Sequence, residues 1–186
     1  MDAPQKNELY TYADYCSWND DQRWEIIDGI AYAMVPAPSW THQALLGSLY
    51  IQFGNFLKGK ACRVFTAPLD VRLDADEGDN TVVQPDLMVV CDRSKMDAHG
   101  IKGAPDMVVE ILSPSTASKD RIVKLSAYRR AGVREYWIVD PDDKSISAYT
   151  LKGGEYVVNA YAGDEIIPVH VLEGLSIRLQ DVFEEW

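Results

Sequence analysis

The spacing of hydrophobic positions along the chain predicts two helices. Between residues 40 and 57, apolar side chains recur every three or four positions, as they do on one face of a helix. Ser39 suits the cap before its first turn, and Gly59 follows its end. The polar run 113–116 offers caps for a second helix that extends to residue 131, where Gly132 ends it. The apolar positions that define the first helix are Leu45, Leu46, Leu49, Phe53, Phe56 and Leu57.

Runs of β-prone residues before, between and after these helices predict a sheet. Residues 23–35 hold two such runs separated by Asp28-Gly29, a dipeptide that suits a tight hairpin turn. The nearly all-apolar run 135–139 predicts a central strand, and the glycine-punctuated runs after Lys144 predict a meander of hairpins. Further strands are predicted at residues 63–66, 69–73, 82–90 and 106–112. This order predicts an α/β fold in which helices flank a central mixed β-sheet, with additional β-hairpins.

The composition is that of a globular protein, since 47% of the 186 residues are hydrophobic and 25% are charged. This length fits one domain over residues 1–186, with the meander at 144–186. No apolar run approaches the ~20 residues that cross a bilayer, and the start of the chain lacks the order of a secretory signal. We therefore expect a cytoplasmic protein that does not enter a membrane. The cysteines Cys16, Cys62 and Cys91 are odd in number and far apart, so we expect reduced, mostly buried thiols.

Charge is distributed unevenly along the chain. The net charge of −11 argues against broad, nonspecific coating of nucleic acid. The segment 119–134 nevertheless holds six basic residues against one acid, Asp120. Such a segment is either a solvated helix face that balances charge elsewhere or a local binding site for phosphates. Its basic residues are Lys119, Arg121, Lys124, Arg129, Arg130 and Arg134.

Two acids, Asp86 and Glu110, lie in runs that are otherwise apolar, where an unpaired carboxylate is costly. If the two strands pair antiparallel around the loop 91–105, Asp86 lies opposite Glu110, and the same register pairs Met88 with Val108. Opposite residues share one face, with Cβ atoms ~4.5–5.5 Å apart, so the two carboxylates converge. Hard oxygen ligands of this kind suit magnesium or manganese. Alternatively, Asp86 belongs to a turn and Glu110 forms a salt bridge with an arginine.

Lys124 is the candidate partner of these acids. On a helical wheel it falls almost opposite Arg129 and Arg130, on the side that Arg121 shares, so its ammonium points inward. An inward ammonium beside a metal would stabilise the charge that develops in phosphodiester hydrolysis. The alternative is a lysine whose stem covers core residues while its ammonium reaches solvent. Ile122 falls on the exposed side, so the wheel is imperfect.

Several motifs share their wording and order with a known family. They are RWEIIDG, a following helix that bears His42, PDLMVV, GAPDMVVEILSPST and DRIVKLSAYRRAGVREYWIVDP. From about residue 25 to 141 the chain resembles the Uma-type restriction endonucleases of the PD-(D/E)XK nuclease superfamily. The resemblance implies a restriction-endonuclease-like fold and a divalent-metal-dependent endonuclease that hydrolyses DNA with magnesium or manganese. Because related enzymes often pair to cut both strands, it also implies a homodimer.

The resemblance also assigns roles to residues. It implies that Asp86 is the motif aspartate and Glu110 the acid of the (D/E)XK half-motif, both holding metal. The chain departs from the pattern at Leu112, which stands where the lysine is usual. Lys124 resembles a migrated substitute for that lysine. Glu25 matches an acidic position that adds a ligand or activates water, although an exposed hairpin glutamate is equally plausible.

Other residues and functions remain open at this point. Lys119 and Arg121 are the expected DNA contacts, whereas His42 on an apolar helix is more often a packed or capping residue than a catalyst. One alternative function is a catalytically inactive nucleic-acid-binding or regulatory module, which needs the basic helix but not the pair Asp86 and Glu110. Another is a protein-interaction domain, which would be indifferent to Lys124. The acidic net charge favours these alternatives, since it weakens steering to DNA.

Overall fold

The computed structural model describes residues 4, 8–19, 22–34, 37–75, 78–114 and 117–183. Its larger layer is a six-stranded mixed sheet in the order β12-β11-β10-β9-β6-β3. Strands β9 and β10 are parallel, and the other neighbours are antiparallel. The strands are β3 (Arg63–Thr66), β6 (Leu87–Val90), β9 (Met107–Ile111), β10 (Glu135–Asp140), β11 (Ser145–Lys152) and β12 (Glu155–Ala162).

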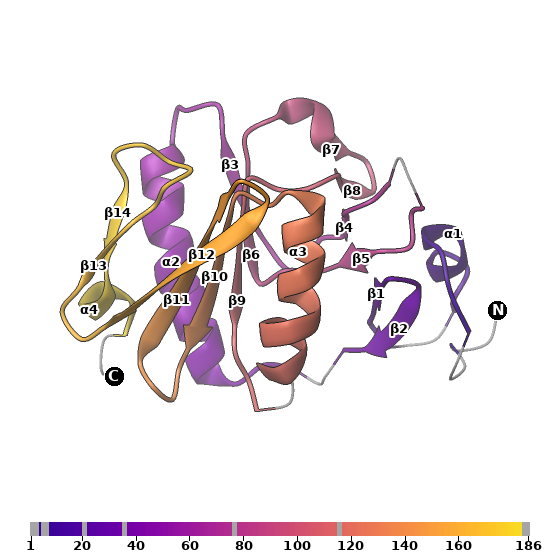
Figure 1. The fold of residues 1–186 in the computed structure, drawn as a ribbon, viewed down its shortest axis with the longest axis horizontal. Helices are drawn as coiled ribbons and strands as arrows, with labels where there is room; N and C mark the ends of the chain where they lie inside the picture. The colour runs from indigo at the N-terminus through magenta and orange to yellow at the C-terminus, as the bar shows by residue number, and fades with distance from the viewer. Residues whose placement is uncertain are drawn as a thin grey trace.

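Helices cover both faces of this sheet (Figure 1). Alternate residues of a strand point to opposite faces, so Leu87 and Val109 pack beneath α2 (Trp40–Leu57). Their neighbours Met88 and Val108 pack on the other side, with α3 (Leu125–Ala131). Because β6 and β9 are buried on both faces, they read as continuous apolar runs in the sequence.

A second six-stranded sheet, in the order β2-β1-β5-β4-β8-β7, shares the core on the α3 side. The sequence predicted one strand over residues 82–90, and this is wrong because the run divides between the two sheets. Pro85 lacks an amide hydrogen, and the amide of Gln84 donates to the Glu25 carboxylate rather than to a strand. The strands of this sheet are β1 (Trp24–Ile27), β2 (Ile30–Ala33), β4 (Val71–Arg72), β5 (Val82–Val83), β7 (Met96–Asp97) and β8 (Gly100–Lys102).

Several local predictions are confirmed. The first hairpin turns at Asp28-Gly29, whose φ angles are 53° and 78°, and the Ser39 side chain caps α2. Strands β6 and β9 pair antiparallel in the expected register, with Met88 opposite Val108. The second helix differs from its prediction: residues 115 and 116 lie outside the described residues, and the segment Lys119–Lys124 is π-helical before α3 begins.

The remaining elements lie at the two ends of the chain. The hairpin of β11 and β12 is followed by β13 (Ile166–Pro168), β14 (Ser176–Arg178) and the short α4 (Leu179–Val182). The chain thus forms hairpins here, but β13 pairs with β14 in a sheet of its own and does not continue from β12. A four-residue helix, α1 (Tyr12–Tyr15), precedes β1. Among the described residues, the helices are all too short or too polar to cross a membrane.

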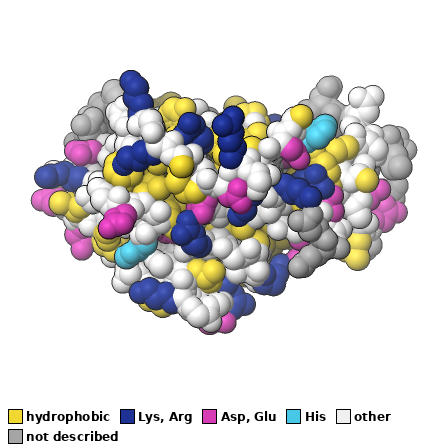
Figure 2. All heavy atoms as spheres, turned by 90° about the horizontal axis from the view of Figure 1, so that it is seen from above, with side chains coloured by type: hydrophobic (Ala, Val, Ile, Leu, Met, Phe, Trp, Pro, Cys, Tyr) yellow, Lys and Arg dark blue, Asp and Glu magenta, His cyan; other side chains and the backbone are white. Residues whose placement is uncertain are grey.

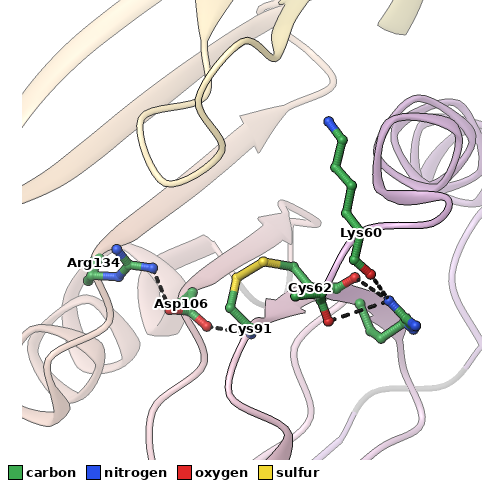
Figure 3. Close-up of a disulfide and its surroundings, with 7 residues drawn as sticks. Lys60, Cys62, Cys91, Asp106 and Arg134 are labelled. Carbon is green, nitrogen blue, oxygen red and sulfur yellow. Dashed lines mark hydrogen bonds and ion pairs between the residues drawn. A yellow bond between two sulfur atoms is a disulfide. The ribbon is translucent and has the colours of Figure 1, made fainter.

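The structure corrects the expectation for the cysteines. Cys62 and Cys91 form a disulfide, and Cys16 is exposed. Cys62 directly precedes β3 and Cys91 directly follows β6, where Arg63 pairs with Val90, so the antiparallel register sets the two cysteines opposite each other. Figure 3 shows the bridge at the ends of these strands. The prediction was wrong because it considered distance along the chain without pairing the two strands.

Candidate active site

Parallel and antiparallel pairing bring several polar side chains to one end of the strands of the larger sheet. Strands β9 and β10 end there, and β6 begins there because it runs antiparallel to β9. Glu110 lies near the end of β9, and Asp86 immediately precedes β6. The first turn of α2 and the π-helical segment Lys119–Lys124 reach the same end of the strands, which is the lower end in Figure 1. Ligand sites commonly form beyond the carboxyl ends of strands.

Lys124 lies at the centre of this site. Its ammonium nitrogen is 2.8 Å from Glu25 Oε1, 2.8 Å from Glu110 Oε1 and 3.7 Å from Asp120 Oδ1. The side chain is only 4% exposed, so the wheel assigned its inward direction correctly. Burial opposes the charge on Lys124, but the surrounding carboxylates outweigh burial and raise its pKa well above the ordinary value. The lysine therefore stays charged within the protein.

Glu25 is a second buried member of the site and not an exposed hairpin residue. The Gln84 amide donates to its Oε1 at 3.0 Å, and the ammonium of Lys119 lies 2.6 Å from its Oε2. Burial alone would raise the pKa of Glu25, but the charges of Lys124 and Lys119 outweigh burial and lower this pKa to about 2. Glu25 is therefore ionised at neutral pH.

Glu110 has the opposite electrostatic character. Burial raises its pKa to about 8, supported by the nearby carboxylates of Asp120 and Asp86 and opposed by Lys124. The Tyr128 hydroxyl donates to Glu110 Oε1 at 2.7 Å, beside the ammonium of Lys124. The surroundings thus favour the ionised form of Glu25 and the protonated form of Glu110. Environments that push two carboxyl pKa values apart are typical of functional sites.

Asp86 is oriented by groups from two different elements. The Ile111 amide donates to its Oδ2 at 2.8 Å, and His42 Nε2 lies 3.1 Å from the same oxygen. Burial alone would lower the pKa of His42, but the hydrogen bond and the charge of Asp86 outweigh it and raise this pKa. The Asp86 side chain is 20% exposed, so its carboxylate is accessible from outside.

The donor set limits how a divalent ion could be held. Among the described residues, no group of three or more histidine, cysteine, aspartate or glutamate side chains is arranged to hold a metal. Asp86 and Glu110 supply two carboxylates, and magnesium is often held by one or two carboxylates together with waters and substrate phosphates. These two residues therefore fit such an ion, provided that Glu110 gives up its proton.

The basic segment is engaged in ion pairs along its length. The Lys119 side chain is 16% exposed and pairs with Glu25. The Arg121 side chain is 44% exposed, and its guanidinium lies 2.7 Å from the Asp140 carboxylate. The wheel placed Arg121 beside Lys124, but the first side chain is exposed and the second is buried. A π-helical turn holds more residues than an α-helical turn, so these two residues lie farther apart around the axis than a wheel of 100° per residue implies. The other pairs are Arg129 with Glu155, Arg130 with Asp28, and Arg134 with Asp106.

These pairs reduce the net field of the segment. The pair of Arg134 and Asp106 lies beside the disulfide (Figure 3), and on the face of the molecule in Figure 2 basic and acidic side chains are interspersed. The interpretation of a helix face that balances charge elsewhere therefore accounts for much of the basic segment. Arg121, whose side chain is 44% exposed, keeps an accessible guanidinium near the site.

Sequence reasoning missed three contributors to the site. Asp120 and Tyr128 stand four residues before and after Lys124, so all three share one side of the helical segment. That spacing was a usable signal. Gln84 contributes through its backbone amide, which no pattern of side chains reveals.

Comparisons with known proteins agree with this fold. The chain is 28% identical over 174 residues to "Uncharacterized protein slr1290" from Synechocystis sp., covering 91% of this chain and 89% of that protein. A crystal structure described as "a putative nuclease belonging to DUF820" from Anabaena variabilis superposes with a TM-score of 0.76. It shares 20% identity and covers 94% of this chain and 97% of its own. The fold is therefore restriction-endonuclease-like.

A family model identifies the chain more directly. The model described as "Uma2: Putative restriction endonuclease" matches residues 9–180. This match confirms the resemblance of the motifs and extends it beyond residues 25–141, so that it includes both C-terminal hairpins. The chain belongs to the Uma2 family.

Proposed function

We propose that the protein is a divalent-metal-dependent endonuclease that hydrolyses DNA phosphodiester bonds. The observation that carries the proposal is the buried ammonium of Lys124 between Glu25 and Glu110, at the end of the strands where Asp86 is accessible. Two carboxylates and a lysine at one end of the strands of a mixed sheet match the chemistry of metal-assisted phosphodiester hydrolysis. Family membership and fold support this assignment.

The residues of the site would divide the work as follows. Asp86 and Glu110 would hold magnesium or manganese, which when bound neutralises phosphate charge and lowers the pKa of a bound water. Lys124 would provide a fixed positive charge beside the scissile phosphate, without reorganisation, because the surrounding carboxylates hold it in place. Glu25 would fix the position of Lys124, and the Ile111 amide would orient Asp86. Cytoplasmic location and action as a homodimer remain predictions.

Replacing Asp86 by Asn tests the metal role. We expect Asp86→Asn to reduce nicking of supercoiled plasmid at least ~100-fold in magnesium or manganese, because an amide is a poor ligand for these ions. The fold should persist, since the amide oxygen can still accept from the Ile111 amide. Thermal unfolding provides that control. Equal nicking by repurified wild type and variant would refute the role, and DNA binding without nicking in both would favour the inactive module.

Charge reversal tests the proposed DNA contacts of Arg121 and Lys119. Arg121→Glu should weaken binding to a short duplex in calcium more than Arg129→Glu does, because Arg121 lies near the site whereas Arg129 lies beside Glu155 of β12. The wild-type affinity should fall steeply with salt. Lys119→Gln is a third variant, expected to weaken binding less because Lys119 is mostly buried. Equal losses for the two arginine variants would indicate a general charge effect.

A further inference from the structure

Strand β12 forms an edge of the larger sheet, and within the part of the chain that is described no strand pairs with its outer side. It is eight residues long and pairs with β11 in an uninterrupted register from Glu155 to Ala162, with no bulge. Natural sheets usually protect such edges with lysine, proline, bulges or short strands. Residues 156–162 contain no charged side chain and no proline. This edge therefore lacks the usual protection.

Both faces of β12 are also accessible at its centre. Val157 and Val158 point to opposite faces of the sheet and are 45% and 51% exposed. Residues 157–160 are all exposed, so within the described part of the chain no helix covers the centre of the strand on either face. An added strand would therefore meet no helix on either side at this position. It would also cover the exposed valine side chains.

The direction of the backbone groups shows which residues can pair outward. The Ala162 amide donates to the Glu165 side chain, and the Ala162 carbonyl accepts from the Glu165 amide, so both groups point away from β11. In an antiparallel strand, alternate residues direct their amide and carbonyl to the same side. Tyr156, Val158 and Ala160 therefore present their amides and carbonyls to the outer edge.

We propose that β12 binds a second copy of this chain, pairing antiparallel with its own β12 about a two-fold axis at Val158. With this axis, Tyr156 pairs with Ala160 of the second copy, and Val158 pairs with Val158 of the second copy. All three outward-facing residues then exchange amide-to-carbonyl hydrogen bonds. An axis at a neighbouring residue would leave one of them without its pair. The larger sheet of one copy and the larger sheet of the second copy then form one continuous sheet.

The self-pairing register and the lack of charge on this strand favour a second copy as the occupant. The chain carries a net charge of −11, so two copies repel each other across most surfaces. The uncharged residues 156–162 remove like charges from the contact itself. A symmetric pair is also the commonest form of soluble oligomer. The interface does not depend on nuclease activity, whereas its use in cutting both DNA strands rests on the proposed function.

Complementary charges at residue 158 test this pairing. We expect the wild type to dimerise in sedimentation velocity over a concentration series, and both Val158→Lys and Val158→Glu to dimerise at least ~10-fold more weakly, because each places like charges across the axis. An equimolar mixture of the two variants should recover the dimer. Ile166→Lys in β13, where the side chain is also 51% exposed, is the matched control and should leave dimerisation unchanged.

Each other outcome overturns the proposal. A wild type that stays monomeric, or dimers that persist in both Val158 variants, would exclude this edge. Loss of the dimer on Ile51→Lys alone would instead assign the interface to the exposed side of α2, where Ile51 is 60% exposed. Two monomeric variants that do not recover a dimer when mixed would exclude the axis at Val158. Because sedimentation needs neither metal nor DNA, these outcomes are independent of the nicking results.

Discussion

Replacing Lys124 by Met is expected to lower the free energy of unfolding by about 3–5 kcal/mol, the usual effect of removing one partner from a buried ion pair. The ammonium is the shared partner of Glu25 and Glu110, so its loss removes one of the two ammonium groups that offset the charge of the buried Glu25 carboxylate. Methionine keeps an unbranched side chain of similar length, which limits the cavity. Nicking of plasmid should fall below detection at temperatures where the variant is folded. Chemical denaturation and the plasmid assay measure the two effects.

Two further variants separate stability from catalysis. Arg129→Met removes an ion pair in which the Glu155 side chain is 74% exposed, and it should cost less than about 1 kcal/mol. The double variant Lys124→Met with Glu25→Gln should regain part of the lost stability, because no ionised Glu25 remains buried. It should still not nick DNA. A single Lys124 variant that is as stable as Arg129→Met would contradict the buried ion pair, and nicking by any folded Lys124 variant would contradict its catalytic role.

The elements that sequence predicted correctly are those set by local chemistry. The dipeptide Asp28-Gly29 adopts positive φ angles, and Ser39 supplies the cap of α2, so each signal lies within a few residues of its effect. The run 82–90 shows the limit, since its apolar residues belong to two sheets and are buried in both. Pro85 was the available signal for the division. The disulfide required the pairing of β3 with β6, which no local pattern specifies.

The candidate site was predictable to the extent that strand register determines it. The register of β6 and β9, in which Leu87 lies opposite Val109, could be derived from the two apolar runs alone, and it brings Asp86 beside the end of β9. The burial of Glu25 could not, because its contact with Lys119 joins residues 94 positions apart, on a hairpin and a helix. The π-helical turn that separates Arg121 from Lys124 also has no reliable sequence signal.

The opposite pKa shifts of Glu25 and Glu110 predict a distinctive dependence of stability on pH in metal-free protein. The Glu25 pKa of about 2 lies below the ordinary 4.5, so its contribution to stability is complete above pH 4.5 and is lost as the pH falls towards 2. The Glu110 pKa of about 8 lies above 4.5, so its contribution is complete below pH 4.5 and is lost as the pH rises towards 8. Stability should therefore decline on both sides.

Glu110→Gln is the variant that isolates the alkaline decline. Between about pH 5 and 8 the wild type should lose stability with a slope approaching ~1.4 kcal/mol per pH unit from this one group, because the folded protein keeps a proton on the buried Glu110 that the unfolded chain releases. Glutamine does not titrate, so the variant should be flatter over this range and more stable than the wild type at pH 8. Glu25→Gln should instead flatten the curve between pH 4.5 and 2, while keeping the alkaline decline. Denaturation by urea in EDTA across this range measures both slopes. Parallel curves for the wild type and Glu110→Gln between pH 5 and 8 would show that Glu110 is already ionised in the folded protein, and that its carboxylate accepts a divalent ion without releasing a proton.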